Sequence, residues 1–207
     1  MLEIYLCRHG QSVANAEGIL AGHTDSPLND IGKGQAQELG QLAKNAGLRF
    51  DHIYCSPLSR AKDTAKIIAE ITSSRRPEIM DDLIERDFGF LTGKPYSEIA
   101  KSGSKLWQTD DIVYFLDGEG VETFPDCLKR AKRVLDTVHK NHADGKVLLV
   151  AHGDLGMMLF AAFHSTPWDE ALRHFHFGNS ELLLLHEDSK HKPHVFEIDQ
   201  RGLVEKA

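Results

Sequence analysis

Short apolar runs alternate along the chain with longer segments in which apolar residues recur at helical spacing. The short runs at 2–7, 52–55 and 147–150 predict strands, and the last is typical of a strand buried on both faces. The periodic segments predict helices that begin at Asn29 or Asp30, after Cys55, at Phe124 and at Asp154. This order of elements is typical of an α/β fold, and we expect three layers, α/β/α, around a mixed, mostly parallel sheet.

Two of these helices carry specific expectations. In the first, the apolar positions Ile31, Leu39, Leu42 and Ala46 predict the buried face, and Gly47 follows the end. In the second, Ser56 and Pro57 are a favourable cap and first position, with the helix running to about Glu70. The other two helices are expected over 124–138 and 154–163.

The remaining segments are less regular. Residues 11–27 are polar and rich in glycine, which predicts a loop over the end of the first strand. Residues 75–120 give a mixed signal, with a short helix expected near Ser97. The runs at 181–186 and 195–199 predict two antiparallel strands joined by a polar turn at 190–193.

Aromatic residues among acidic ones mark the segment 94–120. Trp107, Tyr114 and Phe115 favour a cap or insert over the sheet edge that selects the substrate, and the alternative is a peripheral helix with a few apolar contacts. A chain of 207 residues is long enough for one sizeable α/β domain. We therefore expect a single domain over 1–207, with this segment as its cap.

Composition narrows the class of partner. The formal net charge is −7, which disfavours nucleic acid and anionic membranes, so a small anionic ligand would need a few converging cations. The three cysteines are widely spaced and the twelve histidines form no zinc-binding pattern, so we expect no disulfide framework and no metal. The first strand begins almost at once and no apolar run reaches about 20 residues, so we expect a cytoplasmic protein.

Polar residues stand where the predicted strands end. Arg8 and His9 follow the first strand, Arg60 lies in the first turn of the helix after the second, and His152 follows the third. Ligands of open α/β sheets bind at the carboxyl edge of the strands. Guanidinium forks match phosphate oxygens, and a neutral imidazole is a nucleophile without an activating base. This set predicts phosphoryl transfer through a phosphohistidine.

Several ordered motifs extend this pattern over nearly the whole chain. They are Arg8-His9-Gly10 continuing to Asn15, the loop from Gly22 to Leu28, Ser56-Pro57-Leu58-Ser59-Arg60-Ala61, the segment from Glu85 to Gly89, and Val150-Ala151-His152-Gly153. On these residues the chain resembles the histidine phosphatase superfamily, the phosphoglycerate mutase-like proteins. The resemblance implies a phosphomonoester hydrolase that acts on a small phosphorylated metabolite without a metal or other cofactor.

The resemblance also implies roles for individual residues. His9 would be the phosphorylated nucleophile, and Arg8, Arg60 and His152 would bind the phosphoryl oxygens with help from Asn15. Glu85 would donate the proton to the leaving group. Gly22, His23 and Gly153 are expected beside the substrate. The segment around Glu122 resembles another glutamate segment that the family places near the site. Two structural roles for Glu122 stay open beside that one: it could hold Arg130, or it could cap the following helix.

Three other functions stay open. The first is phosphoglycerate mutase-type transfer. The case for it is weaker because Phe88 and Tyr96 stand where such relatives place tyrosine and lysine. A cysteine phosphatase would use Cys55 with Arg60, but the spacing is one residue short and Pro57 removes an amide donor. A third possibility is a non-catalytic module that binds phosphorylated ligands on the same fold. The substrate and the oligomeric state are not predicted, and a sugar phosphate, α-ribazole phosphate, a phosphorylated acid and a phosphoprotein are all compatible with the sequence.

Overall fold

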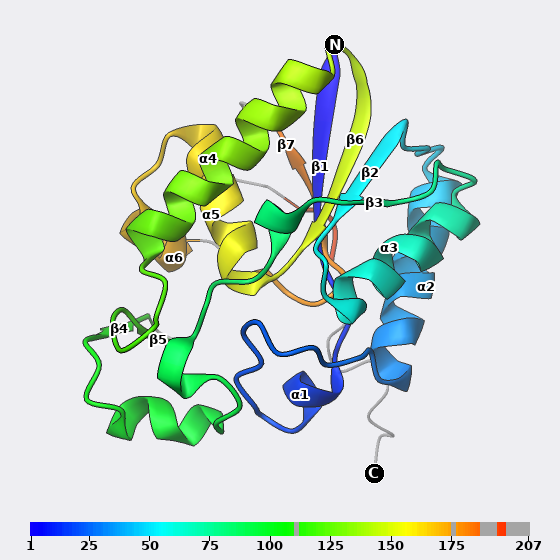
Figure 1. Ribbon diagram of the computed structural model, residues 1–207. Coiled ribbons are helices and arrows are strands. Elements are labelled where there is room, and N and C mark those ends of the chain that lie inside the picture. The colour runs from blue at the N-terminus through cyan, green and yellow to red at the C-terminus, as the bar shows by residue number, and fades with distance from the viewer. Residues whose placement is uncertain (110–111, 175–176, 187–193, 198–207) are drawn as a thin grey trace.

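The computed structural model describes residues 1–109, 112–174, 177–186 and 194–197 of the chain (Figure 1). Its main sheet, within the described residues, has six strands in the order β3-β2-β6-β1-β7-β8. These strands are β1 (Leu2–Arg8), β2 (His52–Cys55), β3 (Glu78–Ile79), β6 (Gly145–Ala151), β7 (Leu182–Leu185) and β8 (His194–Phe196). The four strands from β3 to β1 are parallel, β7 is antiparallel to β1, and β8 is antiparallel to β7.

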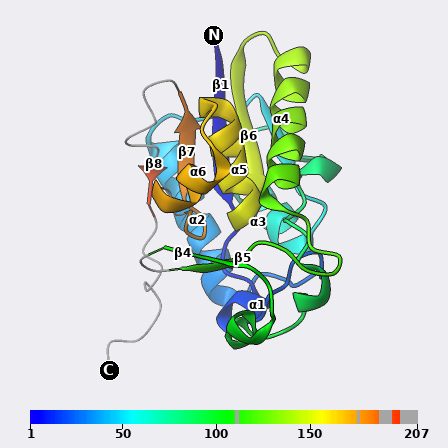
Figure 2. The same cartoon turned by 90° about the vertical axis from the view of Figure 1, so that its left-hand side faces the viewer.

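Helices cover both faces of this sheet (Figures 1 and 2). The helices are α2 (Asp30–Asn45), α3 (Ser59–Ile71), α4 (Phe124–Asn141), α5 (Gly153–His164) and α6 (Trp168–His174), with the short α1 (Val13–Ala16) in the loop after β1. One buried cluster joins α4, α5 and α6 to one sheet face, and a second joins α2 and α3 to the other. The expected three-layer fold with a mixed, mostly parallel sheet is confirmed.

The register of the central strands aligns their carboxyl ends. Val150 of β6 pairs with Cys7 of β1 on one side and with Cys55 of β2 on the other. Because side chains alternate between the two faces of a strand, the apolar residues of β1 supply both buried clusters. The residues that follow Cys7, Cys55 and Val150 therefore come together at one edge.

The start of α3 differs from the prediction. Ser56 does not cap the helix, which begins at Ser59 with Leu58 as its N-cap. The reason is tertiary: the N–H of Ser56 donates to the carbonyl of Val150 at 3.1 Å, which extends the sheet by one residue. The hydroxyl of Ser56 contacts His152 instead of the first turn of the helix.

The buried face of α2 also differs from the prediction. Leu39 is buried as expected, but Ile31 and Leu42 are only half-buried and Ala46 is exposed. The remaining buried positions belong mainly to small residues, namely Gly32, Gln35, Ala36, Gly40 and Ala43. Small side chains let α2 approach its neighbours closely, so the apolar pattern alone misplaced this face.

The middle of the chain forms short elements instead of a peripheral helix. Short 3₁₀ helices occur at Asp81–Leu83, Gly89–Leu91 and Tyr96–Lys101, the last where a short helix was expected. A two-stranded ribbon follows, β4 (Leu106–Gln108) and β5 (Val113–Phe115), in which Tyr114 and Phe115 are buried. The ribbon lies toward the carboxyl edge of the main sheet (Figure 1).

The carboxyl-terminal strands were expected and are found as β7 and β8, paired antiparallel. The predicted turn at 190–193 and residues 198–199 lie outside the described residues.

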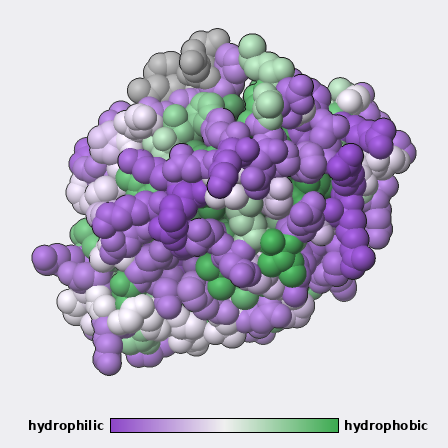
Figure 3. All heavy atoms as spheres, turned by 45° about the horizontal axis from the view of Figure 1, so that its top comes forward, coloured by the Kyte–Doolittle hydropathy of each residue, from purple (hydrophilic) through white to green (hydrophobic). Residues whose placement is uncertain are grey.

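The face at the other end of the sheet, where β1 begins, is largely hydrophilic with scattered apolar residues (Figure 3). Of the helices in the described part of the chain, none combines the length and apolar composition that a membrane-spanning helix needs.

Candidate active site

A cavity of about 560 Å³ opens at the carboxyl edge of the sheet. Its polar wall comes from segments far apart in sequence, and its members include Arg8, His9, Asn15, Gly22, Arg60, Glu85 and Gly153. Its apolar wall comes largely from the segment 94–120, with Phe88, Met157 and Phe177. The structure thus brings Arg8, His9 and Arg60 to one cavity, which the aromatic segment also lines. His152 is fully buried and is not among the lining residues.

His9 is held with one ring nitrogen fixed. Its side chain is buried, with the residue only 3% exposed, and Nδ1 lies 2.6 Å from the carbonyl oxygen of Gly10. A carbonyl oxygen only accepts, so Nδ1 carries the proton and Nε2 carries the lone pair. Burial, with the charges of Arg60 and Arg8, holds the pKa of His9 well below its usual value. The ring is therefore neutral, with the lone pair on Nε2.

Arg60 faces this lone pair. Its Nε donates to His9 Nε2 at 3.2 Å, and its two terminal nitrogens donate to the carbonyls of Gly22 and Thr24 at 2.8 and 3.0 Å. Gly22 has φ of 49°, a left-handed conformation in which glycine is favoured. The loop after α1 therefore presents carbonyls that hold the Arg60 guanidinium, which is almost fully buried, against His9.

Arg8 enters the cavity from the end of β1. Its Nη1 donates to the carbonyl of Phe177 at 2.6 Å, while its buried Nε has no hydrogen-bond partner among the described residues. A Cβ on Gly153 would lie only 3.5 Å from Arg8 Cζ. Gly153 therefore lies directly against this guanidinium, and Arg8 keeps an uncommitted donor in the cavity wall.

His152 packs beside His9 at the end of β6. The two ring centroids are 5.0 Å apart, and His152 is fully buried. Its Nε2 lies 2.7 Å from Ser56 Oγ. Burial, with the charges of Arg60, Arg8 and Arg130, holds the pKa of His152 well below its usual value, so this ring is neutral as well.

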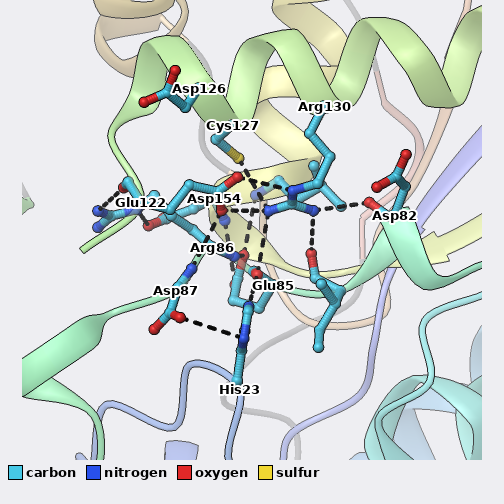
Figure 4. A network of polar contacts seen from close by, with 12 residues as sticks. His23, Asp82, Glu85, Arg86, Asp87, Glu122, Asp126, Cys127, Arg130 and Asp154 are labelled. Atoms are coloured by element: carbon cyan, nitrogen blue, oxygen red, sulfur yellow. Dashed lines mark hydrogen bonds and ion pairs between the residues drawn. The ribbon is translucent and has the colours of Figure 1, made fainter. Parts of the chain in front are cut away.

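Glu85 also lines the cavity, and its carboxyl group lies at the amino end of α5, near Asp154 (Figure 4). Its Oε1 accepts the N–H groups of Arg86 and Leu155 at 2.9 and 3.1 Å, and its Oε2 accepts the N–H of Gly153 at 3.0 Å. Burial and the nearby charge of Asp154 raise the pKa of Glu85, against the lowering effect of these hydrogen bonds. A carboxyl group in this environment can give up a proton and take it back.

Glu122 has a different role from Glu85. Its carboxylate accepts both Nε and Nη2 of Arg130, at 2.9 and 2.6 Å (Figure 4). Arg130 in turn donates to the carbonyls of Asp82, Ile84 and Glu85, so this ion pair holds the segment that carries Glu85. Thr123, not Glu122, caps α4. Of the alternatives for Glu122, the structure shows the one in which it holds Arg130.

Two further predicted residues differ in position. Asn15 lines the cavity, where its Oδ1 also accepts the N–H of Ser12 at 3.1 Å. His23 is not part of the cavity wall: its Nε2 lies 2.7 Å from the carbonyl oxygen of Glu85, and its Nδ1 lies 3.6 Å from Asp87 (Figure 4). His23 therefore contacts the backbone of Glu85 from outside, which does not fit the expected contact with substrate.

The pair Arg86 and Asp154 was missed by the sequence reasoning. Both residues line the cavity, and Arg86 Nε donates to Asp154 Oδ2 at 2.7 Å. The Arg86 guanidinium also lies 4.3 Å from the ring centroids of Phe115 and Phe124. The sequence offered one indication that these residues lie at the site: Arg86 directly follows Glu85, and Asp154 closely follows His152.

Cys55 does not fit a nucleophile. It packs within the apolar cluster between the sheet and α2 and α3, and burial raises the pKa of its thiol to about 11. A thiol in this environment stays protonated and unreactive at neutral pH. The structure therefore argues against the cysteine phosphatase alternative.

Comparison with known proteins agrees with this geometry. The family model of the histidine phosphatase superfamily (branch 1) matches residues 4–197. The uncharacterized phosphatase PhoE of Bacillus subtilis (strain 168) is 37% identical over 153 residues, which cover 74% of this chain and 72% of PhoE. The probable phosphoglycerate mutase GpmB of Yersinia pestis (strain Pestoides F) is 33% identical over 166 residues, covering 77% of this chain and 74% of GpmB.

A solved structure shares the fold. The mycobacterial glucosyl-3-phosphoglycerate phosphatase in complex with VO3 superimposes with a TM-score of 0.74, covering 88% of this chain and 91% of that one at 22% identity. Together with the family match over most of its length, this likeness leads to one conclusion. The chain belongs to the histidine phosphatase superfamily, branch 1.

Proposed function

We propose that this protein is a phosphomonoester hydrolase in which His9 Nε2 accepts the phosphoryl group. One observation carries the proposal: the hydrogen bond from Nδ1 to the Gly10 carbonyl leaves Nε2 unprotonated in the cavity, facing Arg60. A neutral imidazole with its lone pair so directed is a nucleophile that needs no separate base. Arg8 and Arg60 supply positive charge for the phosphoryl oxygens at the same place.

The reaction has two displacements. In the first, His9 Nε2 forms a bond to phosphorus while the ester P–O bond breaks, and Glu85 gives its proton to the departing oxygen. In the second, a water oxygen bonds to phosphorus as the P–N bond breaks, and the Glu85 carboxylate takes the proton of that water. Inorganic phosphate leaves, and both His9 and Glu85 return to their starting states.

The electrostatics of the cavity support these roles. Arg8, Arg60 and a donor from His152 would stabilise the charge on the transferring oxygens, a task that metal ions perform in other phosphoryl transfer enzymes. Asn15 adds an amide beside them. The raised pKa of Glu85 favours the protonated form that the first step requires.

The opposite wall supports a leaving group without charge. Arg86 lines the cavity, but its charge is balanced by Asp154, and the nearby wall consists of residues such as Ile99, Val113 and Phe115. A carboxylate on the leaving group would meet no free cation among the described residues of this wall. We therefore favour hydrolysis of a phosphomonoester whose leaving group is uncharged and apolar over transfer between phosphoglycerates. We assign the selection to the segment 94–120 acting as a cap.

Trapping the phosphoenzyme tests the proposal. The wild type should hydrolyse p-nitrophenyl phosphate and, on brief reaction with a ³²P-labelled ester, give an acid-labile, base-stable label on His9. His9→Ala should lose both turnover and label. A wild type that turns over without such a label would disprove the covalent route, and absence of turnover on a panel of phosphorylated metabolites would favour a binding module.

A second assay separates the two enzyme classes. The protein is given 3-phosphoglycerate and a trace of the bisphosphate, and both phosphate release and isomer interconversion are followed. We expect slow phosphate release and no interconversion. Rapid interconversion would establish phosphoglycerate mutase-type transfer instead.

A further inference from the structure

Ser56 stands beside His152 because of the register of the sheet. Cys55 of β2 pairs with Val150 of β6, and the N–H of Ser56 donates to the Val150 carbonyl. Ser56 and His152 are both fully buried, and Ser56 Oγ lies 2.7 Å from His152 Nε2. The contact is therefore built into the strand pairing.

The hydrogen bonds of Ser56 indicate which atom holds the proton. Within the described residues, Ser56 Oγ has one other contact, the N–H of Leu58 at 3.3 Å, which can only donate. The hydroxyl proton of Ser56 thus has His152 Nε2 as its acceptor. If Nε2 accepts, the neutral ring carries its own proton on Nδ1.

His152 Nδ1 is buried and has no hydrogen-bond partner among the residues that the structure describes. A buried N–H without a partner loses the hydrogen bond that it makes to water in the unfolded chain, so such a group calls for an acceptor. The ring lies against His9, where the phosphoryl group would bind. A phosphoryl oxygen is an acceptor of the right kind.

We propose that Ser56 is a positioning residue that holds His152 in the tautomer protonated at Nδ1, so that this N–H donates to a phosphoryl oxygen. This role of Ser56 rests on the proposed function, because the Nδ1–H of His152 would be a further donor at the same phosphoryl site. The opposite tautomer would leave the Ser56 proton without an acceptor and would turn a lone pair of Nδ1 toward an anion.

The tautomer can be read directly in the wild type without any substrate. In protein labelled with ¹⁵N at histidine, long-range ¹H–¹⁵N correlation distinguishes a proton on Nδ1 from one on Nε2. His152 is assigned by the signal that disappears in His152→Asn. We expect the Nδ1–H pattern, and the Nε2–H pattern would overturn the proposal.

The donor role is tested by titration with inorganic phosphate. Saturable binding should shift the His152 Nδ1 resonance together with that of His9. Binding that shifts only the His9 signal would overturn the assignment of Nδ1 as a phosphoryl donor. Because neither measurement depends on turnover, failure of the phosphohistidine mechanism and failure of the Ser56 assignment give different results.

Variants separate positioning from general stability. Ser56→Ala should lower kcat on p-nitrophenyl phosphate by roughly 10- to 100-fold, the range for groups that orient a ligand histidine, and should weaken the Nδ1–H preference. Ser56→Thr keeps the hydroxyl and should restore both. Ser74→Ala is the matched control, because Ser74 Oγ also accepts a backbone N–H and contacts one side chain, at the far end of α3.

If Ser56→Ala and Ser74→Ala lose stability equally and keep equal kcat, the role of Ser56 is structural and the proposal fails. The same conclusion follows if Ser56→Thr leaves kcat as low as Ser56→Ala. Should Ser56→Ala not fold, the tautomer and phosphate titration of the wild type still decide the matter.

Discussion

Arg60 shows how a single side chain is prepared for its task before any ligand arrives. Carbonyls of Gly22 and Thr24 hold its terminal nitrogens, while its Nε points at His9. Because these contacts fix the guanidinium, little reorganisation remains when the phosphoryl charge develops. A preorganised cation of this kind acts mainly on kcat.

Replacing Arg60 by alanine should lower kcat/KM for p-nitrophenyl phosphate on the order of 10²–10³-fold, as for loss of one preorganised donor. Arg60→Lys should recover little of this, because an ammonium group cannot reproduce the planar fork. Steady-state kinetics measure the effect, with the exposed Arg49→Ala as control. Near-normal kinetics in Arg60→Ala would remove this residue from the site.

Asp154 should set the alkaline side of the pH profile. Its charge raises the pKa of Glu85, which must be protonated to act as the acid, so activity is lost as pH rises through that pKa. Asp154→Asn removes the charge and lowers the pKa of Glu85, so the alkaline limb of kcat/KM should move to lower pH.

The control for this prediction is Asp82→Asn, which removes a surface carboxylate paired with Arg133. The pH dependence of kcat/KM for a slowly leaving alkyl phosphate gives the measurement, since protonation of the leaving group matters most there. An alkaline limb that stays in place in Asp154→Asn would contradict the prediction.

Sequence reasoning found the residues whose place follows from strand ends, and missed those whose role depends on neighbours in space. Arg8, His9 and His152 follow apolar runs, so it could be predicted that Arg8 and His9 meet at one cavity and that His152 lies beside His9. Ser56 has the composition of a helix cap, and only the pairing of β2 with β6 turns it toward His152. The ion pair of Arg86 and Asp154 likewise depends on a contact across the fold.

At the scale of elements, the amino end of α2 packs directly on the loop that follows His9, the proposed nucleophile. A Cβ on Gly32 would overlap the backbone carbonyl of Gln11, two residues after His9. The N–H of Gln11 is held by Gln35 Oε1 at 2.8 Å, from the next turn of the same helix. Helix α2 therefore positions the His9 loop by backbone contact.

Gly32→Ala should destabilise the protein although alanine favours helix. The added methyl group meets rigid backbone, and such overpacking costs about 1–3 kcal/mol. Activity should fall as well, because the loop at Gln11 must move. Gly40→Ala is the control from the same helix, since its Cβ would meet side-chain atoms of Ile71, the nearest being Cδ1 at 2.9 Å and Cβ at 3.2 Å, instead of backbone. Chemical denaturation and kcat measure both effects, and equal stability of the two variants would contradict this account.

Element boundaries were predictable where a long apolar period exists and not elsewhere. Helix α4 has such a period: it begins at Phe124 as expected and ends at Asn141, three residues beyond the expected range, with Phe124, Ala131, Leu135 and Val138 on its buried face. The segment from 75 to 120 has none, because it consists of short 3₁₀ helices and a ribbon whose apolar residues pack on distant elements. Short elements of this kind are determined by tertiary contacts rather than by local pattern.

The whole molecule excludes water from two histidines at once. His9 and His152 are buried against each other and against Arg8 and Arg60, and no side-chain carboxylate among the described residues is hydrogen-bonded to either ring. The arrangement keeps His9, the proposed nucleophile, neutral at physiological pH. Its consequence is that protons bind these rings more readily in the unfolded chain than in the folded one.

This burial predicts a loss of stability in acid. The folded pKa values of His9 and His152 lie well below the ordinary value of about 6.5, so below that pH the unfolded state binds more protons. The free energy of unfolding should therefore fall as pH decreases from about 7 to about 5, with each ring contributing up to about 2 kcal/mol to the difference. Urea denaturation at several pH values measures the free energy of unfolding.

His9→Asn should reduce the difference in stability between pH 7 and pH 5 by one ring's share, whatever the substitution does to stability at neutral pH. Ser74→Ala, in contrast, should lower stability equally at every pH. An unchanged pH dependence in His9→Asn would mean that the His9 ring can bind a proton in the folded protein, and the lone pair assigned to Nε2 would then not be reserved for phosphorus.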